Sequence, residues 1–478
     1  MRCPLSPRIP FLLLSLLATI TATPAETGLE RPPALYLNHT PDACETPVAL
    51  SELTLQDAVK IALCRAPNVR QAHSAIEESG ANLHVAQAKY LPSLHADADA
   101  NRTGKHVRYP AHSAGNYDLH AYSGNARLGL NWLLFDFGQR RAQNDQARAE
   151  LSAALYNKIL VNRDQAITVA DCYYRASSAQ AGAAAAREAA ARAEKNYHVI
   201  KRLREGGVGS IADELLAKVA WQRSLVDNET KAAEAERTTL SLATTVGLPG
   251  HTRIGLPVLP VRTTHRHDAR SSGQDATPHS FDERIIDAVR NHPRLAVARA
   301  NTAAAEAEAQ SIQAQHRPRI SLQANRDIGI TPPATSVAKQ HVNTWSIGLT
   351  VHIPIFDGLS TQYATEAAQA RTRTARETER MVWLQEEQKL LTDLSHMTRT
   401  TQKIAFLEDA ESSATQAYRS AQIRYQQGVG TATELLNAQG ELAALQQTAI
   451  AVHYERLATQ FRLAVALDTL PPAPADSH

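Results

Sequence analysis

The second half of this 478-residue sequence repeats the first half at a spacing of about 220 residues, and this duplication limits the folds open to the chain. The phrase Phe-Asp occurs at 135–136 and again at 356–357, and Gly-Val-Gly occurs at 207–209 and again at 428–430. The separation of the two phrases is the same in both halves. The fold is therefore built from two equivalent units in tandem.

Each unit begins with an amphipathic helix and continues into a pair of strands. We place the first repeat at 52–248 and the second at 281–468, with strand hairpins at 91–134 and 318–356. The second strand of each hairpin has apolar residues at every other position, namely Ala126, Leu128, Leu130, Trp132 and Leu134, and then Trp345, Ile347, Leu349, Val351, Ile353 and Ile355. This period of two predicts strands with one apolar and one polar face.

A polar, alanine-rich stretch of roughly 67 residues without proline follows each hairpin. At 1.5 Å per residue, a helix of that length is ~100 Å long, far longer than the usual globular helix. The two helices end at tip turns, 206–210 and 427–431, after which the chain returns through a second helix. Segment 249–280, rich in Pro, His, Ser and Gly, is predicted to be a linker, and 469–478 a tail.

The N-terminus has the pattern of a secretory signal peptide. Arg2 and Arg8 precede an apolar run and then small residues, so we assign 1–25 to the signal and 26–51 to an N-terminal extension. No later stretch reaches the ~18 consecutive apolar residues of a membrane-spanning helix. We therefore expect the exported chain to lie in the periplasm, in the outer membrane or outside the cell.

The cysteines agree with export to an oxidising compartment. We predict a disulfide between Cys44 and Cys64, which closes a loop of about 19 residues and contributes ~3 kcal/mol of stability. The alternative is that both are unrelated buried thiols. Cys172, inside a long helix, is predicted to be a packed free thiol.

The strands have the length needed to cross an outer membrane at a tilt, with lipid against the apolar face and water against the polar face. Four strands cannot close a barrel, and open sheet edges are not tolerated in hydrocarbon. A homotrimer would supply twelve strands for one shared barrel and twelve helical passes for a second tube. The alternative is a soluble antiparallel sheet with one buried face.

The sequence contains no motif of enzymatic chemistry. We find no Walker loop, His-Glu-x-x-His, nucleophile elbow or Cys-x-x-Cys, and the pair His265 and His267 falls in the linker, where a solvated loop is the expected state. A net charge of +2 does not favour nucleic-acid binding. We therefore expect neither an enzyme nor a cofactor or metal site.

The order of these features resembles the TolC family of outer-membrane efflux and secretion channels. The resemblance covers nearly the whole mature chain and implies a mainly helical fold with membrane β-strands, in which a trimer forms a 12-stranded outer-membrane β-barrel continuous with a periplasmic 12-helix α-barrel. The implied localisation is the bacterial outer membrane, with a long periplasmic extension. In such channels the energy comes from an inner-membrane transporter, and the channel is a passive conduit.

The resemblance is strongest to channels of type I secretion systems. It implies a periplasmic adaptor, an inner-membrane ABC transporter reached through that adaptor, and an exported protein substrate, a toxin of the adenylate cyclase-haemolysin type. One alternative is the outer-membrane component of a pump for drugs or other small molecules. Another, from a different class, is a periplasmic coiled-coil adaptor or scaffold.

The same resemblance assigns adaptor contact to the two tips. The residues concerned are Gly207, Val208 and Gly209 in the first repeat and Gly428, Val429 and Gly430 in the second. A purely structural interpretation is also available, because glycine supplies the positive φ that a tight turn between helices requires. The two interpretations are compatible.

An acidic residue follows each tip, Asp213 in the first repeat and Glu434 in the second. By resemblance, such acids line a periplasmic constriction, and three copies would supply six carboxylates that attract cations. However, Ser210 and Thr431 stand three residues before them, so both pairs also have the form of a capping box.

Two residues near this constriction depart from the family pattern. Gly430 occupies a position where a basic residue can lock the closed state, and Asn437 stands where a second acidic ring can occur. The lock is therefore expected to be weaker or differently built.

Further residues receive structural or environmental roles. Asp136 and Asp357 are predicted to be helix N-caps after the strands. Polar strand residues, namely Asp97, Asp99, Arg127 and Asp327, are expected to face the water-filled lumen.

Overall fold

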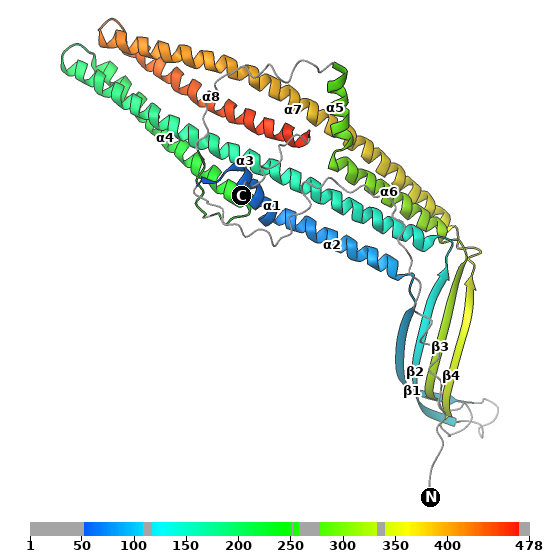
Figure 1. Cartoon of the computed structure of the whole chain (residues 1–478). Helices are drawn as coiled ribbons and strands as arrows, with labels where there is room; N and C mark the ends of the chain where they lie inside the picture. Colours follow the sequence, from blue (N-terminus) through cyan, green and yellow to red (C-terminus); the bar gives the residue numbers. More distant parts are fainter. Residues whose placement is uncertain (1–51, 109–116, 251, 258–277, 332–339, 468–478) are drawn as a thin grey trace, which may run out of the picture. The chain divides into compact units, whose positions relative to one another are not determined.

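The two repeats contain the same six elements in the same order (Figure 1). The computed structural model describes residues 52–108, 117–250, 252–257, 278–331 and 340–467. The first repeat consists of α1 (Leu55–Arg65), α2 (Pro67–Ala88), β1 (Ser93–Val107), β2 (Tyr117–Phe135), α3 (Gln139–Glu205) and α4 (Ile211–Val246). The second consists of α5 (Pro278–Arg290), α6 (Pro293–Ala314), β3 (Arg319–Thr331), β4 (Gln340–His352), α7 (Ser360–Gln426) and α8 (Ala432–Ala466).

The two long helices, α3 and α7, are each 67 residues long, which confirms the length predicted for them. At 1.5 Å per residue each spans ~100 Å. Each follows a strand hairpin and ends at a tip turn, from which α4 or α8 returns over 36 or 35 residues. The tip turns are therefore at the ends of the long helices remote from the sheet (Figure 1).

The short helices begin at residues that favour a helix start, either N-cap side chains or a proline at the first helical position. The Thr54 side chain accepts a hydrogen bond from the backbone N–H of Asp57 at the start of α1. A proline occupies the first position of α2 and of α6, where its missing N–H costs no helical hydrogen bond. His292 caps α6 by accepting from the N–H of Arg294.

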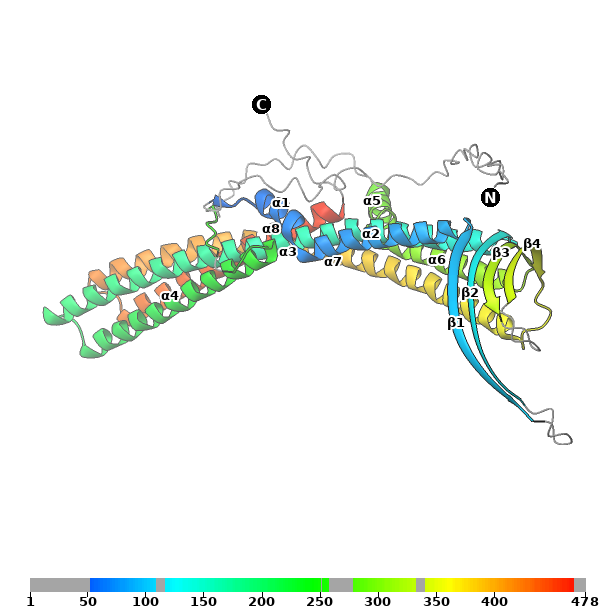
Figure 2. The same cartoon turned by 90° about the horizontal axis from the view of Figure 1, so that it is seen from below.

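The four strands form one antiparallel sheet in the order β1-β2-β3-β4. The pairing of β2 with β3 reaches Gly124 and Ile330, whereas β1 and β2 stay paired through Asn101–Val107 and Tyr117–Ser123. Figure 2 shows β1 and β2 continuing beyond β3 and β4. At its other end β4 stops at His352 rather than near 356, because Pro354 has no N–H to donate to a strand ladder.

The helices are arranged as a wall with two unlike edges. Towards the tips, α3 contacts α4 on one side and α8 on the other, and α8 contacts α7. Towards the sheet, α3 contacts α2 and α6, and α6 contacts α7. In the described part of the chain, one edge of the wall is therefore formed by α2 and α4 and the other by α7.

Three clusters of buried side chains hold this wall together. The first joins α1, α3 and α4 around Val169, Tyr173 and Leu242, all at most 2% exposed. The second joins the helices near both tips, where Ile200 and Leu435 are almost fully buried. The third joins α5, α7 and α8. Alanines make up much of the buried surface of α3, which allows close helix approach.

Cys64 takes part in a disulfide, and Cys172 is a partly buried free thiol whose Sγ lies 3.6 Å from the hydroxyl of Thr245. The predicted partner, Cys44, lies outside the described residues, so this pairing stays a prediction. The predicted signal 1–25, the extension up to residue 51 and the tail 469–478 also lie outside them. Within the described residues, no helix combines the length and apolar character that crossing a membrane requires.

Candidate functional site

Both tips are tight helix-to-helix turns that require glycine. Gly207 has a φ of 83° and Gly428 a φ of 76°, values that favour glycine. In the first turn the N–H of Gly207 donates to the carbonyl of Arg204 at 2.9 Å, and that of Val208 donates to Leu203 at 3.0 Å. The second turn repeats both bonds between equivalent residues. These are the two bonds of a Schellman motif, which satisfies the last carbonyls of the helix.

The second glycine of each tip is needed for close approach of the backbone. A Cβ added to Gly209 would lie 3.1 Å from the backbone nitrogen of Arg204. A Cβ added to Gly430 would lie 3.1 Å from the backbone nitrogen of Tyr425. A side chain at either position would push the return helix away from the long helix.

The valines between these glycines project from the tips. Val208 is 74% exposed and Val429 66% exposed. From the first tip an exposed apolar stripe continues along α4 through Ile211, Leu215 and Val219, at spacings of four residues. The tips thus present apolar side chains to whatever lies beyond them, and the first tip presents more of them than the second.

The two acids that follow the tips are held differently. Glu434 and Thr431 form the predicted capping box, in which the Thr431 hydroxyl accepts from the N–H of Glu434 at 3.2 Å. The box predicted for Ser210 and Asp213 is wrong, because the Ser210 hydroxyl accepts from the N–H of Ala212 instead. An N-cap oxygen can reach either the second or the third amide of a helix, and Ser210 uses the second.

Asp213 is consequently not engaged by the start of its own helix and lies near the second repeat. Burial raises the pKa of Tyr425 on α7, and the negative charge of Asp213 raises it further. Glu434 and Asn437 are exposed on α8. Among the described residues, no hydrogen bond joins Asp213, Glu434 and Asn437 to one another, so their predicted arrangement around a constriction stays a prediction.

An ion pair distinguishes the first tip from the second. Arg204 on α3 pairs with Glu214 on α4, whereas the equivalent residues of the second repeat are Tyr425 and Leu435. Tyr425 is 8% exposed and Leu435 is 1% exposed, so a buried apolar contact replaces the ion pair. Sequence reasoning missed this difference, although aligning the two repeats at their Gly-Val-Gly turns reveals it.

A buried polar network links the two repeats behind the tips. The side-chain amide of Asn196 on α3, 1% exposed, donates to Gln439 on α8 at 2.6 Å and to the hydroxyl of Tyr418 on α7 at 3.1 Å. Because buried polar groups are costly unless paired, this network favours one alignment of the three helices. No motif in the sequence predicts this network.

One face of the sheet is polar. The guanidinium of Arg127 on β2 contacts the carboxylate of Asp327 on β3 at 2.5 Å. Asp97 pairs with Arg127 in the β1–β2 register, and Asn125 donates to Asp99 at 3.2 Å. The structure therefore brings the four predicted polar strand residues onto one face, across three strands.

The opposite face of the sheet is largely apolar and uncovered in the single chain, with the exposed Arg326 standing between Leu128 and Trp345. Leu94, Leu128, Ile328 and Ile347 lie on it and are between 47% and 67% exposed. A face of this kind on four strands needs either another protein surface or lipid to cover it.

Hydrogen bonds to two aspartates stabilise the connections between the sheet and the long helices. The buried carboxylate of Asp136 accepts from the N–H of Arg140 at 2.8 Å and from its guanidinium at 3.0 Å. Asp357 likewise accepts from the N–H of Thr361 at 3.0 Å. The N-cap positions themselves belong to Gly138 and Leu359, so the predicted N-cap assignment is wrong by two residues, although both aspartates do satisfy the helix start.

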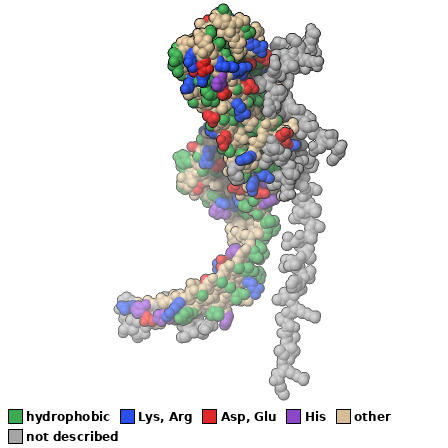
Figure 3. All heavy atoms as spheres, turned by 90° about the vertical axis from the view of Figure 1, so that its left-hand side faces the viewer, with side chains coloured by type: hydrophobic (Ala, Val, Ile, Leu, Met, Phe, Trp, Pro, Cys, Tyr) green, Lys and Arg blue, Asp and Glu red, His purple; other side chains and the backbone are tan. Residues whose placement is uncertain are grey.

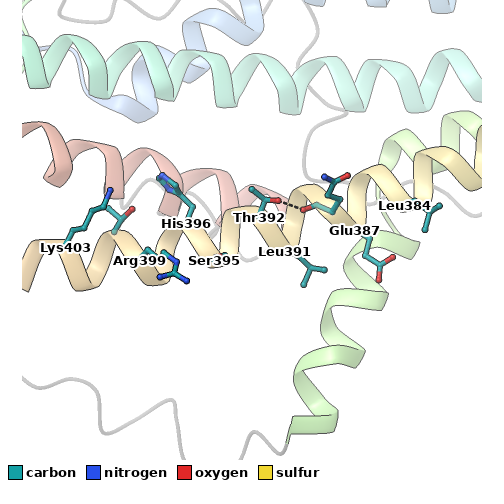
Figure 4. Close-up of a pocket in the computed structure, with 10 residues that line it drawn as sticks. Leu384, Glu387, Leu391, Thr392, Ser395, His396, Arg399 and Lys403 are labelled. Atoms are coloured by element: carbon teal, nitrogen blue, oxygen red, sulfur yellow. Dashed lines mark hydrogen bonds between the residues drawn. The ribbon is translucent and has the colours of Figure 1, made fainter.

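The exposed edge of α7 carries a shallow groove of mixed polarity (Figure 4). Its lining includes Leu384 and Leu391 together with the basic residues His396, Arg399 and Lys403. All of these side chains come from one helix, and His396 also contacts Glu455 at 3.2 Å. In the described chain no group of three His, Cys, Asp or Glu side chains is arranged to hold a metal ion.

Comparisons with known proteins agree with this architecture. The model of the family described as outer membrane efflux protein matches residues 58–247 and 285–469, one match for each half of the chain. The chain is 28% identical over 441 residues to protein CyaE of Bordetella pertussis, covering 88% of this chain and 86% of that protein. It is 24% identical over 421 residues to the pyoverdine export outer membrane protein OpmQ of Pseudomonas aeruginosa, covering 86% and 84%.

A solved structure has the same fold. The outer membrane protein VceC of Vibrio cholerae superposes with a TM-score of 0.72 at 20% identity, covering 86% of this chain and 95% of that protein. Members of the matched family are channels rather than periplasmic scaffolds, and they are passive conduits rather than enzymes. The chain therefore belongs to the outer membrane efflux protein family, the TolC-like channels of the bacterial outer membrane.

Proposed function

We propose that three copies of this chain form the outer-membrane channel of a type I secretion system, a passive conduit for an exported protein toxin. In this proposal a periplasmic adaptor recruits the channel, and an inner-membrane ABC transporter supplies the energy through that adaptor. The proposal goes beyond family membership in its subunit number, its partners and its cargo.

The observation that carries the proposal is the pair of unlike edges. The sheet ends in β1 on one side and β4 on the other, and the helical wall ends in α2 and α4 or in α7. Because the two edges differ, copies would associate head to tail, and such a contact gives a closed ring when the rotation between successive copies adds up to a full turn. Closure would pair β4 of one copy with β1 of the next and leave no open strand edge in the membrane.

The sheet faces agree with this ring. The apolar face would meet lipid, whereas the polar face with Arg127 and Asp327 would line the lumen. The exposed apolar stripe on α4 and the exposed Leu384, Leu391 and Phe406 of α7 would become contacts between neighbouring copies. Three copies would give twelve strands, a number compatible with a closed membrane barrel.

Protein secretion is preferred over small-molecule efflux because the family resemblance of the sequence is strongest to type I secretion channels and the identity to CyaE is the higher of the two quoted above. Similarity to a pyoverdine export protein supports the second candidate, which is export of small molecules by the same kind of conduit. Both candidates share the ring and differ in cargo.

The test is to place the chain in a bacterial strain that lacks its own outer-membrane exit channels. One strain carries a type I transporter, its adaptor and a protein toxin substrate; another carries a small-molecule pump and its adaptor. Toxin in the medium, with no change in drug susceptibility in the second strain, supports the proposal. Restored drug resistance without secreted toxin would favour the alternative, and a monomer after outer-membrane fractionation would exclude the ring.

A further inference from the structure

The apolar face of the sheet changes character where β1 and β2 extend past β3 and β4. Ala100 pairs with Gly124, and Gly124 pairs with Ile330, at the last position that three strands share. The next pair on the same face is Arg102 with Tyr122, since alternate residues of a strand point to the same side. A cation and an aromatic ring thus stand where β1 and β2 continue alone, and Arg326 beside Trp345 is a second cation on the same face, within the four-stranded part.

The two side chains contact each other. The guanidinium of Arg102 lies over the ring of Tyr122, 5.5 Å from its centre, and Tyr122 is 68% exposed. Two residues further along each strand, His120 stands opposite Gly104, and a Cβ added to that glycine would lie 3.4 Å from the Nδ1 of the histidine ring. Arg102 makes no ion pair with any carboxylate in the described part of the chain, so its charge is available to a ligand.

Other charges on this end of the hairpin are partly compensated. The carboxylate of Asp118 pairs with the ring of His106, and the Nε–H of Arg108 donates to the Nε2 of the same ring at 2.8 Å. The formal charges of Arg102, Arg108 and Asp118 add up to a positive net charge even when His106 and His120 are neutral. Figure 3 shows basic, histidine and acidic side chains together at this end of the sheet.

We propose that Arg102 and Tyr122 bind the phosphate of an outer-leaflet membrane lipid. The inference rests on the proposed function in one respect, namely that the strands cross the outer membrane with their apolar face towards lipid. In that placement Arg102 lies beyond the four-stranded part of the sheet, towards the outer-leaflet headgroups, and aromatic residues of membrane barrels are enriched at the headgroup level. Guanidinium groups bind phosphate oxygens through paired, charge-assisted hydrogen bonds.

The ring of Tyr122 acts as a positioning group. Stacking on an aromatic face orients the guanidinium and leaves its N–H groups free to donate at their edge. A lipid held in this way would anchor each copy of the extended hairpin against the membrane surface. The ligand class is therefore a phosphorylated lipid of the outer leaflet, whose negative charge complements this end of the hairpin.

The test is a titration of the purified full-length protein in detergent, followed by native mass spectrometry. Three probes are compared: diphosphorylated lipid A, its monophosphorylated form and inorganic phosphate. The wild type is expected to retain diphosphorylated lipid A, and Arg102→Gln is expected to weaken that retention by five-fold or more. Tyr122→Phe should keep the affinity because the ring remains, whereas Tyr122→Leu should lose it.

Arg70→Gln, which removes an exposed arginine from α2 far from the hairpin, is the matched control and should leave binding unchanged. Equal lipid binding by the wild type and Arg102→Gln would overturn the proposal. Competition by inorganic phosphate at the lipid's own concentration would identify a free-phosphate site and overturn the lipid assignment. The conductance of the same preparations distinguishes the proposed lipid site from the proposed channel function. A protein that conducts ions but retains no lipid would overturn the lipid site and leave the channel function intact.

Discussion

Arg294 on α6 contacts the buried carboxylate of Glu386 on α7, with 3.1 Å between its Nη1 and the Oε1 of the glutamate. Glu386 is 6% exposed, and the other terminal nitrogen of Arg294 lies 3.3 Å from Asp164 on α3. One guanidinium therefore joins the long helices of both repeats through the short helix between them. The pair lies beside a cavity lined by α3, α5, α7 and α8.

Replacing Arg294 by methionine is expected to destabilise the fold because it removes the nearer of the two groups that contact the buried carboxylate of Glu386, the other being His292, whose Nε2 lies 3.7 Å away. Breaking a buried ion pair costs about 3–5 kcal/mol, and partial exposure of Arg294 reduces the expected loss to about 2 kcal/mol. Denaturant unfolding followed by helical circular dichroism measures it. Arg299→Met is the matched control, since Arg299 pairs with the more exposed Glu379, and it should cost less than ~1 kcal/mol.

A double variant tests whether the buried carboxylate causes the loss of stability. Arg294→Met combined with Glu386→Leu removes both charges, so it should be more stable than Arg294→Met alone. If the double variant is less stable than the single one, the loss in the single variant does not come from the buried carboxylate.

His292 is expected to make stability depend on pH in the same region. Burial lowers its pKa to about 4, and the positive charges of Arg163, Lys389 and Arg294 contribute. The unfolded chain, with a histidine pKa of about 6.5, binds the proton more readily, so unfolding becomes easier as pH falls from about 6.5 to 4. The loss attributable to His292 is at most about 3 kcal/mol, because the carboxylate of Glu386, 3.7 Å from its Nε2, favours the charged ring and opposes the shift, and the loss is absent above about pH 6.5.

The measurement compares unfolding free energies of the wild type and His292→Asn between pH 7.5 and 4.5. Asparagine keeps an oxygen that can cap α6 but does not titrate, so the variant should lose less stability than the wild type over this range. His84→Asn, at an exposed histidine of α2, should leave the pH dependence unchanged. Parallel pH curves for the wild type and His292→Asn would contradict the prediction.

The elements were predictable because their signals are local and occur twice. Period-two alternation around Leu128 and Leu349 identified the strands, and the absence of proline identified both long helices. Contacts between elements that are distant in the sequence give no such local pattern. Nothing near Arg294 in the sequence indicates Glu386, because which faces meet depends on how helices ~90 residues apart are packed.

The candidate site was predictable only in part for the same reason. The positive φ predicted for the tip glycines is present at Gly207 and Gly428, because the need for positive φ in a tight turn is a local property. The choice of Ser210 between two neighbouring amides is also local, but both bonds are allowed, so sequence could not decide between them. The ion pair of Arg204 with Glu214 required the repeats to be compared residue by residue.

The tip valines give a prediction about partner contact. Replacing both Val208 and Val429 by aspartate should abolish export, because a desolvated, unpaired charge in an apolar contact costs about 2–5 kcal/mol at each site. Secreted substrate in the medium is the measurement, with outer-membrane level and oligomer recorded alongside. Val85→Asp, at an exposed valine of α2, is the matched control and should leave export unchanged. Normal export by the double variant would remove the tips from the adaptor interface.

The acids behind the tips give a prediction about ion passage. Asp213→Asn combined with Glu434→Gln removes six carboxylates from a trimer and should lower the preference for cations, seen as a reversal potential closer to zero across a KCl gradient. Glutamine retains the capping box at Thr431, and Asp213 caps nothing in its own helix, so both changes act on charge rather than on fold. Asp227→Asn combined with Glu229→Gln, at two exposed acids further along α4, serves as the charge-matched control. An unchanged reversal potential in the double variant would mean that the narrowest part of the conduit lies elsewhere, because an acidic ring at a constriction governs selectivity only where the ions pass close to it.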